Sequence, residues 1–152
     1  MKAKLLRLFS MILTFLFGSL GLNSCVMYGS PYCDFAVKGK VKDTDGEPVS
    51  EAKVVVDAYN SWIDGIGKHY TILDYTDTLY TDGSGYVEKA AILTGEPSEV
   101  RITIVDADGE ENGKFDDVVL ENLELKQLKR GGKGWYQGSY EIDFEVVVDI
   151  DE

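Results

Sequence analysis

Cysteine, histidine and basic residues are all scarce in this sequence. Its 152 residues include two cysteines and one histidine, and 15 Lys and Arg face 27 Asp and Glu for a formal net charge of −12. Two cysteines cannot build a disulfide framework, and one histidine cannot supply a histidine-rich metal centre. A chain this acidic repels a phosphate backbone, so a nucleic acid is excluded as the expected partner.

Patterns that accompany catalysis are missing as well. His69 is the only histidine, and no Ser-His-Asp arrangement can be assigned around it. Nothing marks two of the acidic residues as a glycosidase pair. The glycine-rich stretch 131–134 lacks the spacing and the Ser or Thr of a phosphate-binding loop. We therefore expect a protein that is not an enzyme and that holds no cofactor, a calcium ion being the one candidate.

The first 24 residues have the layout of a secretory signal. Lys2, Lys4 and Arg7 precede an apolar run over residues 8–22, and no acidic residue occurs among the first 24. A helix needs ~20 apolar residues to cross a bilayer, so a run of about 15 is too short for a permanent span. We expect a signal peptide helix over residues 1–24 that is removed from the mature protein.

The run ends in Leu-Asn-Ser-Cys at residues 22–25. This sequence resembles the lipobox of bacterial lipoproteins, with a branched apolar residue at −3, a small one at −1 and the lipidated cysteine at +1. The resemblance implies that Cys25 carries acyl chains such as palmitate. Several chains hold a protein on a membrane far more firmly than one. The alternative is an ordinary signal peptide cleaved nearby, with Cys25 free to pair with Cys33.

The mature chain is long enough for one domain. Without the first 24 residues, 128 remain, with 12 basic against 27 acidic residues and a net charge of −15. A chain of this length builds a single core. We expect a tether over residues 25–33 and one domain over residues 34–152. Cys33 is then a small buried or tether side chain, a partner in an intermolecular disulfide, or a catalytic thiol, the last lacking a marked base.

Alternation of apolar and polar residues dominates the rest of the chain and predicts β-strands. It is clearest near the C-terminus, where Tyr140, Ile142 and Phe144 begin an apolar face opposite acidic residues. Turn sequences such as 43–46 and 82–85 separate the strands roughly every 8–12 residues. This spacing predicts an all-β sandwich of about seven strands, Ig-like or transthyretin-like. The clearest expected strands cover residues 35–42, 52–59, 70–81, 86–92, 100–104 and 140–150.

The segment 118–130 has two interpretations. Leu120, Leu123 and Leu128 could lie on one helical face. Leu123 and Leu125 instead fit a strand, which we favour. The acidic residues on the outer face of the last strand would discourage edge-to-edge pairing of that strand.

Several of these stretches resemble known families. VKGKVKDTDGEPVSEAKVVVDA at residues 37–58, followed by TDGSGYV at 81–87, resembles the carboxypeptidase-regulatory-like, transthyretin-related β-sandwich. YGSPYCDFAVKGKV at 28–41, DADGEENGKF at 106–115 and KGWYQGSYEIDF at 133–144 resemble the small radical-SAM-associated lipoproteins of Bacteroidota. The resemblance implies a β-sandwich lipoprotein whose gene lies near that of a radical SAM enzyme, and it implies no particular activity.

Carboxylates are densest in residues 106–117. The run Asp-Ala-Asp-Gly at 106–109 places two carboxylates around a tight turn, and Ca²⁺ takes six to eight oxygen ligands. The spacing departs from that of an EF-hand loop. A solvated acidic turn between two strands is the simpler interpretation. If calcium binds here, the expected ligands are Asp106, Asp108, Glu110, Asn112 and Asp116.

Aromatic residues offer a candidate partner surface. Trp62 and Tyr70 lie in a long middle segment, and Trp135 and Tyr136 precede the last strand. Exposed Trp and Tyr often dominate binding to partners, although such residues also fill cores. Residues 60–69 form a longer connection than a hairpin requires, and loops on a rigid scaffold often carry binding.

Together these patterns predict a lipid-anchored β-sandwich of the bacterial cell envelope, on the outer membrane, that acts as a non-catalytic binding or accessory module. Its expected partners are the membrane, through the lipid on Cys25, and an envelope protein or a glycan. Two alternatives stay open. One is a substrate that a radical SAM enzyme modifies, at Cys33 or at an exposed tyrosine. The other is a calcium-dependent, adhesin-like surface module.

Overall fold

The computed structural model describes residues 29–107, 109 and 114–150, and the regular structure in these ranges is entirely β-strand. The expected signal peptide and Cys25 lie outside the described residues. Within those ranges no helix is long and apolar enough to cross a membrane. The strands are β1 (Tyr32–Asp43), β2 (Lys53–Ile63), β3 (His69–Tyr80), β4 (Tyr86–Leu93), β5 (Glu99–Val105), β6 (Val118–Leu120), β7 (Lys126–Arg130) and β8 (Tyr136–Val148).

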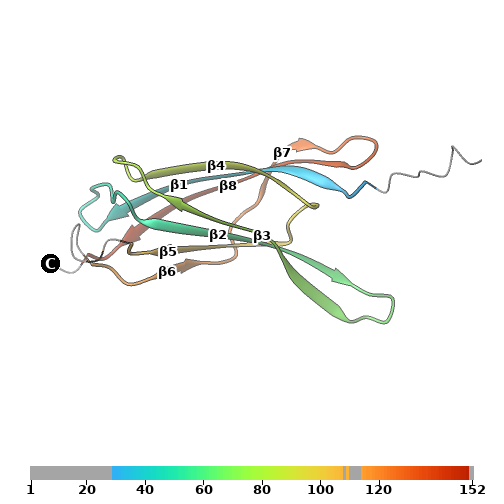
Figure 1. Cartoon of the computed structure of the whole chain (residues 1–152), viewed down its shortest axis with the longest axis horizontal. Coiled ribbons are helices and arrows are strands. Elements are labelled where there is room, and N and C mark those ends of the chain that lie inside the picture. Colours follow the sequence, from blue (N-terminus) through green and yellow to red (C-terminus); the bar gives the residue numbers. More distant parts are fainter. Residues whose placement is uncertain (1–28, 108, 110–113, 151–152) are drawn as a thin grey trace, which may run out of the picture.

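The strands form two four-stranded sheets packed as a sandwich (Figure 1). The first sheet has the order β4-β1-β8-β7 and the second the order β3-β2-β5-β6. Neighbouring strands are antiparallel except for β1 and β8, which run parallel at the centre of the first sheet. The expected all-β sandwich is confirmed, with eight described strands where about seven were expected. Residues 118–130 contain two short strands, β6 and β7, and no helix.

The core lies between the two sheets and is built from alternate residues of the long strands. Burying each such side chain contributes roughly 1.5–3 kcal/mol. Aliphatic side chains make up most of the core, whereas the two tryptophans remain 46% and 49% exposed. The largest fully buried side chains are those of Ile102, Ile104, Ile142, Val37, Val41, Val54, Val56 and Val148.

The sandwich begins slightly earlier than the expected tether boundary. Tyr32 and Cys33 are the first residues of β1, and Cys33 is completely buried. The side chain of Cys33 occupies the inward position that precedes Phe35 and Val37 on the same face. Inward-facing alternation therefore extends through Cys33, which belongs to the core of the domain.

The acidic outer face of β8 does not protect an edge, because β8 lies between β1 and β7. Its carboxylates instead meet lysines of the neighbouring strand. Lys38 Nζ lies 2.9 Å from Glu141 Oε2, and Lys42 Nζ lies 2.6 Å from Glu145 Oε1. Such exposed pairs contribute little to stability, typically below ~1 kcal/mol. Their effect here is to balance like charges along the centre of the first sheet.

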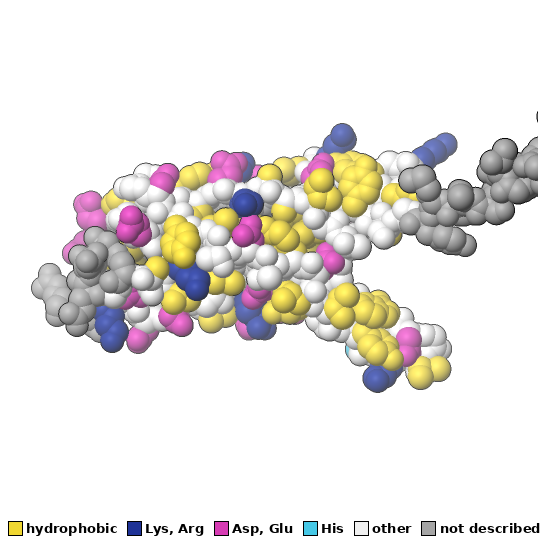
Figure 2. Space-filling view, in the orientation of Figure 1, with side chains coloured by type: hydrophobic (Ala, Val, Ile, Leu, Met, Phe, Trp, Pro, Cys, Tyr) yellow, Lys and Arg dark blue, Asp and Glu magenta, His cyan; other side chains and the backbone are white. Residues whose placement is uncertain are grey.

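The two ends of the sandwich differ in charge. The start of β1 and the β2–β3 turn lie at one end, which we call the tether end (Figure 1). The β1–β2 and β3–β4 connections, with the described parts of the β5–β6 connection, lie at the other. Figure 2 shows Asp and Glu side chains gathered toward that opposite end. We call it the acidic end. The acidic residues of its described connections are Asp45, Glu47, Glu51, Asp82, Asp106, Asp116 and Asp117.

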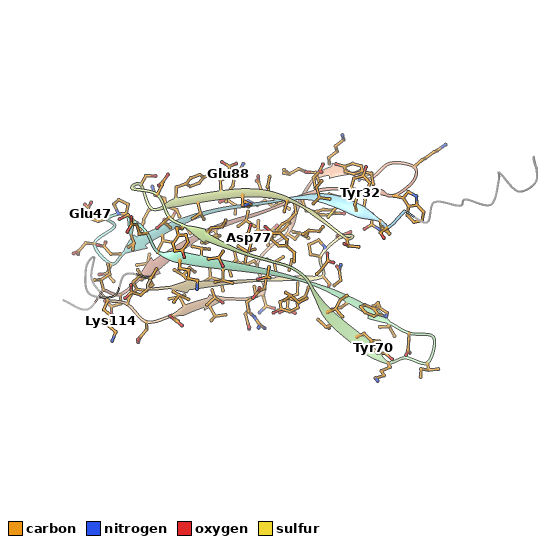
Figure 3. All side chains as sticks on the ribbon, viewed as in Figure 1. Tyr32, Glu47, Tyr70, Asp77, Glu88 and Lys114 are labelled. Atoms are coloured by element: carbon orange, nitrogen blue, oxygen red, sulfur yellow. The ribbon has the colours of Figure 1, made fainter. Side chains whose placement is uncertain are left out.

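An ion pair joins the two sheets along one side of the sandwich. Asp77 of β3 lies 3.1 Å from Lys89 Nζ of β4, and these are edge strands of different sheets (Figure 3). The carboxylate also accepts hydrogen bonds from the Thr78 backbone N–H and the Tyr75 hydroxyl. Lys89 first, and then these two donors, lower the pKa of Asp77. The charged form of the Asp77 carboxylate therefore stabilises the packing of the two sheets against each other.

Thr81 is a buried polar residue that joins two backbone segments. Its hydroxyl donates to the Val49 carbonyl at 2.7 Å and accepts the Ala52 N–H at 2.9 Å, and its side chain is 3% exposed. Both backbone groups would lose a partner if the hydroxyl were absent. An unsatisfied buried polar group costs roughly 1–3 kcal/mol.

The Thr81→Val substitution is therefore expected to lower the free energy of unfolding by roughly 1–3 kcal/mol, because valine keeps the shape and removes both hydrogen bonds. Urea denaturation measures the change. Thr81→Ser is the matched control, since serine keeps the hydroxyl. An unchanged free energy of unfolding in Thr81→Val would contradict a stabilising role for the two hydrogen bonds, whereas a loss in Thr81→Ser would measure the contribution of the methyl group.

Candidate binding surface

The β2–β3 hairpin extends beyond the sandwich. β2 pairs with β3 along its whole length, but it pairs with β5 only from Lys53 to Tyr59. Past Tyr59 the two strands continue without a neighbouring strand on the β5 side. Figure 1 shows this part of the hairpin standing away from both sheets. We call residues 60–72 the arm.

The tip of the arm is a closed turn centred on Asp64. Its carboxylate accepts the backbone N–H groups of Ile66 and Lys68, both at 2.9 Å, and its own N–H donates to the Lys68 carbonyl. Hydrogen bonding, that from Lys68 first, lowers the pKa of Asp64. Gly67 takes a φ of 84°, which few other residues adopt. The tip therefore has a defined shape.

Two of the predicted partner-surface residues stack on the arm. Trp62 and Tyr70 are directly paired across the hairpin, with ring centroids 5.4 Å apart and planes inclined by 12°. Lys68 Nζ lies 5.0 Å from the centroid of the Tyr70 ring. Stacking and the cation–π contact each stabilise such a ribbon by roughly 0.5–1.5 kcal/mol. The rings are thereby held in place while Trp62 stays half exposed.

Exposed isoleucines lie on both faces of the arm and at its tip, with Ile72 on the face of the aromatic pair and Ile63 on the opposite face. Ile66 at the tip is 88% exposed, Ile63 is 59% exposed and Ile72 is 50% exposed. These three residues were not among the predicted partner-surface residues, although Ile63 and Ile66 closely follow Trp62. A two-stranded hairpin has no second layer to cover such side chains. Large apolar residues left open together on a soluble surface are typical of an interaction site.

The base of the arm is fixed by the β4–β5 connection. Asn60 Nδ2 donates to the Thr94 carbonyl at 3.0 Å, and the Thr94 N–H donates to Asp74 Oδ2 at 2.9 Å. The Ser98 N–H donates to the Tyr59 carbonyl, also at 2.9 Å. These contacts link both strands of the hairpin to one loop. They set the direction in which the arm leaves the sandwich.

Trp135 and Tyr136 lie elsewhere on the tether end. They lie where the β7–β8 connection enters β8, and the Tyr136 hydroxyl donates to Asp34 Oδ2 at 2.9 Å. The Tyr136 ring lies 5.4 Å from that of Tyr32. The predicted four-residue surface is thus divided between two projections, the arm and the β7–β8 hairpin, which diverge from the same end (Figure 1).

Cys33 is held in the core by its surroundings. Its thiol is 0% exposed and donates to the Gly95 carbonyl at 3.0 Å. Burial, followed by the nearby Asp34 carboxylate, raises the pKa of Cys33 to about 11. No described residue forms a disulfide with it. A buried thiol of high pKa is a poor nucleophile and a poor target for modification in the folded protein.

Cys33 is accordingly expected to resist iodoacetamide at pH 8. With a pKa of about 11 only ~0.1% of the thiol is ionised there, against roughly a quarter for a free cysteine. Mass spectrometry of the Cys33 peptide should show labelling at least about 100-fold slower in native buffer than in guanidinium, and faster as pH rises toward 11. Native labelling at the unfolded rate would contradict the burial of this thiol.

The predicted calcium loop is described only in part. Asp108, Glu110 and Asn112 lie outside the described residues, whereas Asp106 and Asp116 lie inside them. Asp106 Oδ1 accepts the Gly109 N–H at 2.9 Å, as an aspartate that starts a turn does. Among the described residues no three His, Cys, Asp or Glu side chains are grouped to hold a metal ion. The calcium site stays a prediction.

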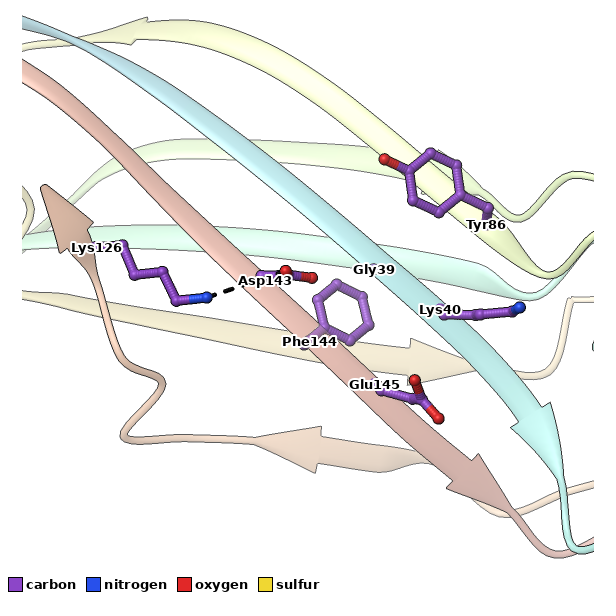
Figure 4. A pocket seen from close by; sticks show the side chains of 7 residues that line it. All are labelled: Gly39, Lys40, Tyr86, Lys126, Asp143, Phe144 and Glu145. Atoms are coloured by element: carbon purple, nitrogen blue, oxygen red, sulfur yellow. Dashed lines mark ion pairs between the residues drawn. The ribbon is translucent and has the colours of Figure 1, made fainter. Parts of the chain in front are cut away.

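A shallow depression lies on the outer face of the first sheet (Figure 4). Its volume is about 450 Å³, and Lys126 Nζ lies 4.0 Å from Asp143 Oδ2 within it. Two lysines balance two carboxylates, so no single charge of ligand is favoured. The depression gives no reason to propose catalysis. Its lining is Gly39, Lys40, Tyr86, Lys126, Asp143, Phe144 and Glu145.

The sandwich is similar to domains of known structure, although no family model matches its sequence and no curated protein matches it significantly. Among solved structures, catechol 1,2-dioxygenase from Pseudomonas arvilla C-1 is similar, with a TM-score of 0.52 and 13% identity over 82% of this chain and 55% of that chain. The mercury-inhibited enzyme from Acinetobacter sp. ADP1 gives a TM-score of 0.49 at 13% identity, covering 84% and 55%. The chain thus spans about half the length of these enzymes, and the likeness to the enzyme from Pseudomonas arvilla shows a shared β-sandwich.

Proposed function

We propose that this protein is a non-catalytic binding module of the cell envelope, anchored in a membrane by lipid on Cys25, and that the arm binds its partner. The exposure of four large apolar side chains on the arm carries the proposal. They are those of Trp62, Ile63, Ile66 and Ile72. The expected partner is an envelope protein or a glycan.

The shape of the arm favours binding over a purely structural role. Its exposed side chains contribute nothing to the core, yet its turn, its stacked rings and its base are all held by named contacts. Pre-ordered aromatic and aliphatic groups bind at a low entropic cost. Such groups often form the hot spots that dominate an interface.

The anchor is supported by the sequence before the sandwich. A basic start, an apolar run and Leu-Asn-Ser-Cys at 22–25 precede the first described residue, Gly29, by a few positions. The same proposal includes the family: a carboxypeptidase-regulatory-like sandwich that is one of the radical-SAM-associated lipoproteins. Palmitate labelling of the wild type, with Cys25→Ala as the control, tests the anchor. Equal labelling of both proteins would exclude lipid at Cys25.

Binding by the arm is tested by crosslinking and affinity capture of the full-length protein in native envelopes. The variant W62A/I66S should recover its main partner at least about 30-fold less than the wild type, as expected for loss of hot-spot residues. Its melting temperature should fall only slightly, because neither side chain packs in the core and the lost ring stacking contributes roughly 0.5–1.5 kcal/mol.

The matched control removes apolar side chains of similar exposure away from the arm. Tyr80 is 59% exposed at the end of β3, and Val147 is 56% exposed on β8. The variant Y80A/V147S should therefore recover the partner normally. Undiminished capture by W62A/I66S, or equal loss in both variants, would rule out the arm as the binding element.

A further inference from the structure

The basic residues of this acidic chain are concentrated in one place. From residue 125 to residue 140 the sequence contains four basic residues and no acidic one. These four are a third of the 12 basic residues that follow residue 24. They belong to β7 and to the connection that leads into β8. We call residues 126–135 the basic hairpin.

The charges of the basic hairpin face solvent. Every residue of β7 is exposed, and β7 is an edge strand of the first sheet. Lys126 lies at the 4.0 Å limit of an ion pair with Asp143. No carboxylate within the described part of the chain lies in ion-pair range of Lys129, Arg130 or Lys133. Their positive charge is therefore available to a partner.

Apolar side chains lie beside these charges at the point where the chain enters the sandwich. Trp135 is 49% exposed, Leu128 is 59% exposed and Tyr32 is 42% exposed. The Tyr32 N–H donates to the Trp135 carbonyl at 2.9 Å. A Cβ at Gly29 would lie only 2.8 Å from the indole Nε1 of Trp135. The indole thus packs against the first described residue.

Charge is distributed unevenly along the sandwich. The basic hairpin lies at the tether end, while Asp and Glu gather toward the acidic end (Figures 1 and 2). The molecule is therefore charged asymmetrically along its long axis. An anionic surface would attract the tether end and repel the acidic end.

We propose that the basic hairpin rests on the anionic phospholipid headgroups of the membrane that holds the protein. This inference depends on the proposed anchor at Cys25. Only four peptide units separate Cys25 from Gly29, a reach of at most about 15 Å. The hairpin consequently lies close to the bilayer, where lysine and arginine are attracted to anionic headgroups. Tryptophan and tyrosine prefer the same interfacial depth.

The test uses the full-length lipidated protein, purified from membranes, with Trp62→Phe so that Trp135 is the only tryptophan. It is reconstituted into vesicles of brominated phosphatidylcholine, alone or with phosphatidylglycerol. Trp135 fluorescence should be quenched strongly in the anionic vesicles and much less in the neutral ones. Quenching should fall in 1 M salt, where the screening length shrinks from about 10 to about 3 Å.

Charge reversal identifies the residues responsible. R130E/K133E should lower the ratio of docked to undocked protein by at least about 25-fold, since each basic residue near an anionic surface favours docking about fivefold. K40E/K114E makes the same change in net charge elsewhere, at two exposed lysines, and should leave quenching unchanged. Flotation with the neutral vesicles, measured in parallel, reports the anchor alone.

The possible outcomes separate the two proposals. If the protein floats with vesicles while Trp135 is quenched equally in neutral and anionic lipid, or equally in the two double variants, the docking proposal is overturned and the anchor proposal stands. A protein that floats without any quenching, and whose R130E/K133E variant loses a protein partner, assigns the basic hairpin to that partner and overturns the docking. A protein that does not float overturns both proposals.

Discussion

Replacing Gly85 with alanine is expected to lower the free energy of unfolding by about 3 kcal/mol or more. Gly85 has a φ of +69°, a conformation that costs other residues roughly 1–2 kcal/mol. Its position adds a clash, because an alanine Cβ would lie 2.3 Å from the Val41 carbonyl oxygen. Val41 lies in β1, and its N–H donates to the Gly85 carbonyl at 2.8 Å. The substitution therefore strains the contact between this turn and the central strand.

Gly83 provides the matched control two residues away in the same turn. No atom lies within 4 Å of a Cβ built at Gly83, and its φ is not positive. Alanine there should leave stability unchanged or raise it by up to about 1 kcal/mol, since it restricts the unfolded chain. Thermal unfolding should separate the two variants by about 10 °C. Similar midpoints would contradict the close packing of Gly85 on β1.

Replacing Gly39 with alanine is expected to cost roughly 1–3 kcal/mol, for a different reason. Gly39 has an extended backbone in β1, so alanine meets no conformational penalty there. The obstacle is the ring of Phe144 on β8, whose Cζ would lie 2.0 Å from an alanine Cβ. Phe144 is 6% exposed and is confined by the core, so its ring cannot simply rotate into solvent.

A double-mutant cycle tests this explanation. Phe144→Leu shortens the side chain that fills the space above Gly39, so G39A/F144L should lose less stability than the two single variants combined. Residues in direct contact typically show interaction energies of about 0.5–3 kcal/mol in such cycles. Urea denaturation of the four proteins gives the value. Strict additivity would mean that alanine at position 39 is accommodated without displacing Phe144.

Strands were predictable wherever one face is buried and the other solvated. β8 was clear in the sequence because Ile142, Phe144 and Val146 alternate with charged residues, and the structure buries all three. Turns were predictable where Asp and Gly meet, as at Asp82, whose side chain accepts the Ser84 and Tyr86 N–H groups. Local chemistry alone determines both kinds of feature.

Pairing partners were not predictable in the same way. Alternation shows that β8 has an inner and an outer face, but it does not reveal that β1 and β7 are its neighbours. For the same reason, the acidic outer face of β8 suggested an edge and belongs to a central strand. The arm was expected as a loop over 60–69 because its strands lack a buried face, which removes the alternation that marks a strand.

The candidate sites were likewise predictable only where residue type alone was sufficient. Trp62 and Tyr70 could be selected from residue type, but their stacking depends on the register of the hairpin. Burial of Cys33 was signalled by its place two residues before Phe35. The absence of acidic residues between Glu124 and Glu141 also marked the basic hairpin in the sequence. The position of the basic hairpin beside the first described residues could be seen only in the structure.

The parallel pairing of β1 with β8 has a consequence for the timing of folding. β1 is the first described strand and β8 the last, and their register runs from Tyr32–Tyr136 to Asp43–Val148. Contacts this distant in sequence form slowly. A ribosome delivers β1 long before β8, so the centre of the first sheet cannot form until β8 has emerged. The order of the strands therefore delays closure of the sandwich until this late strand is available.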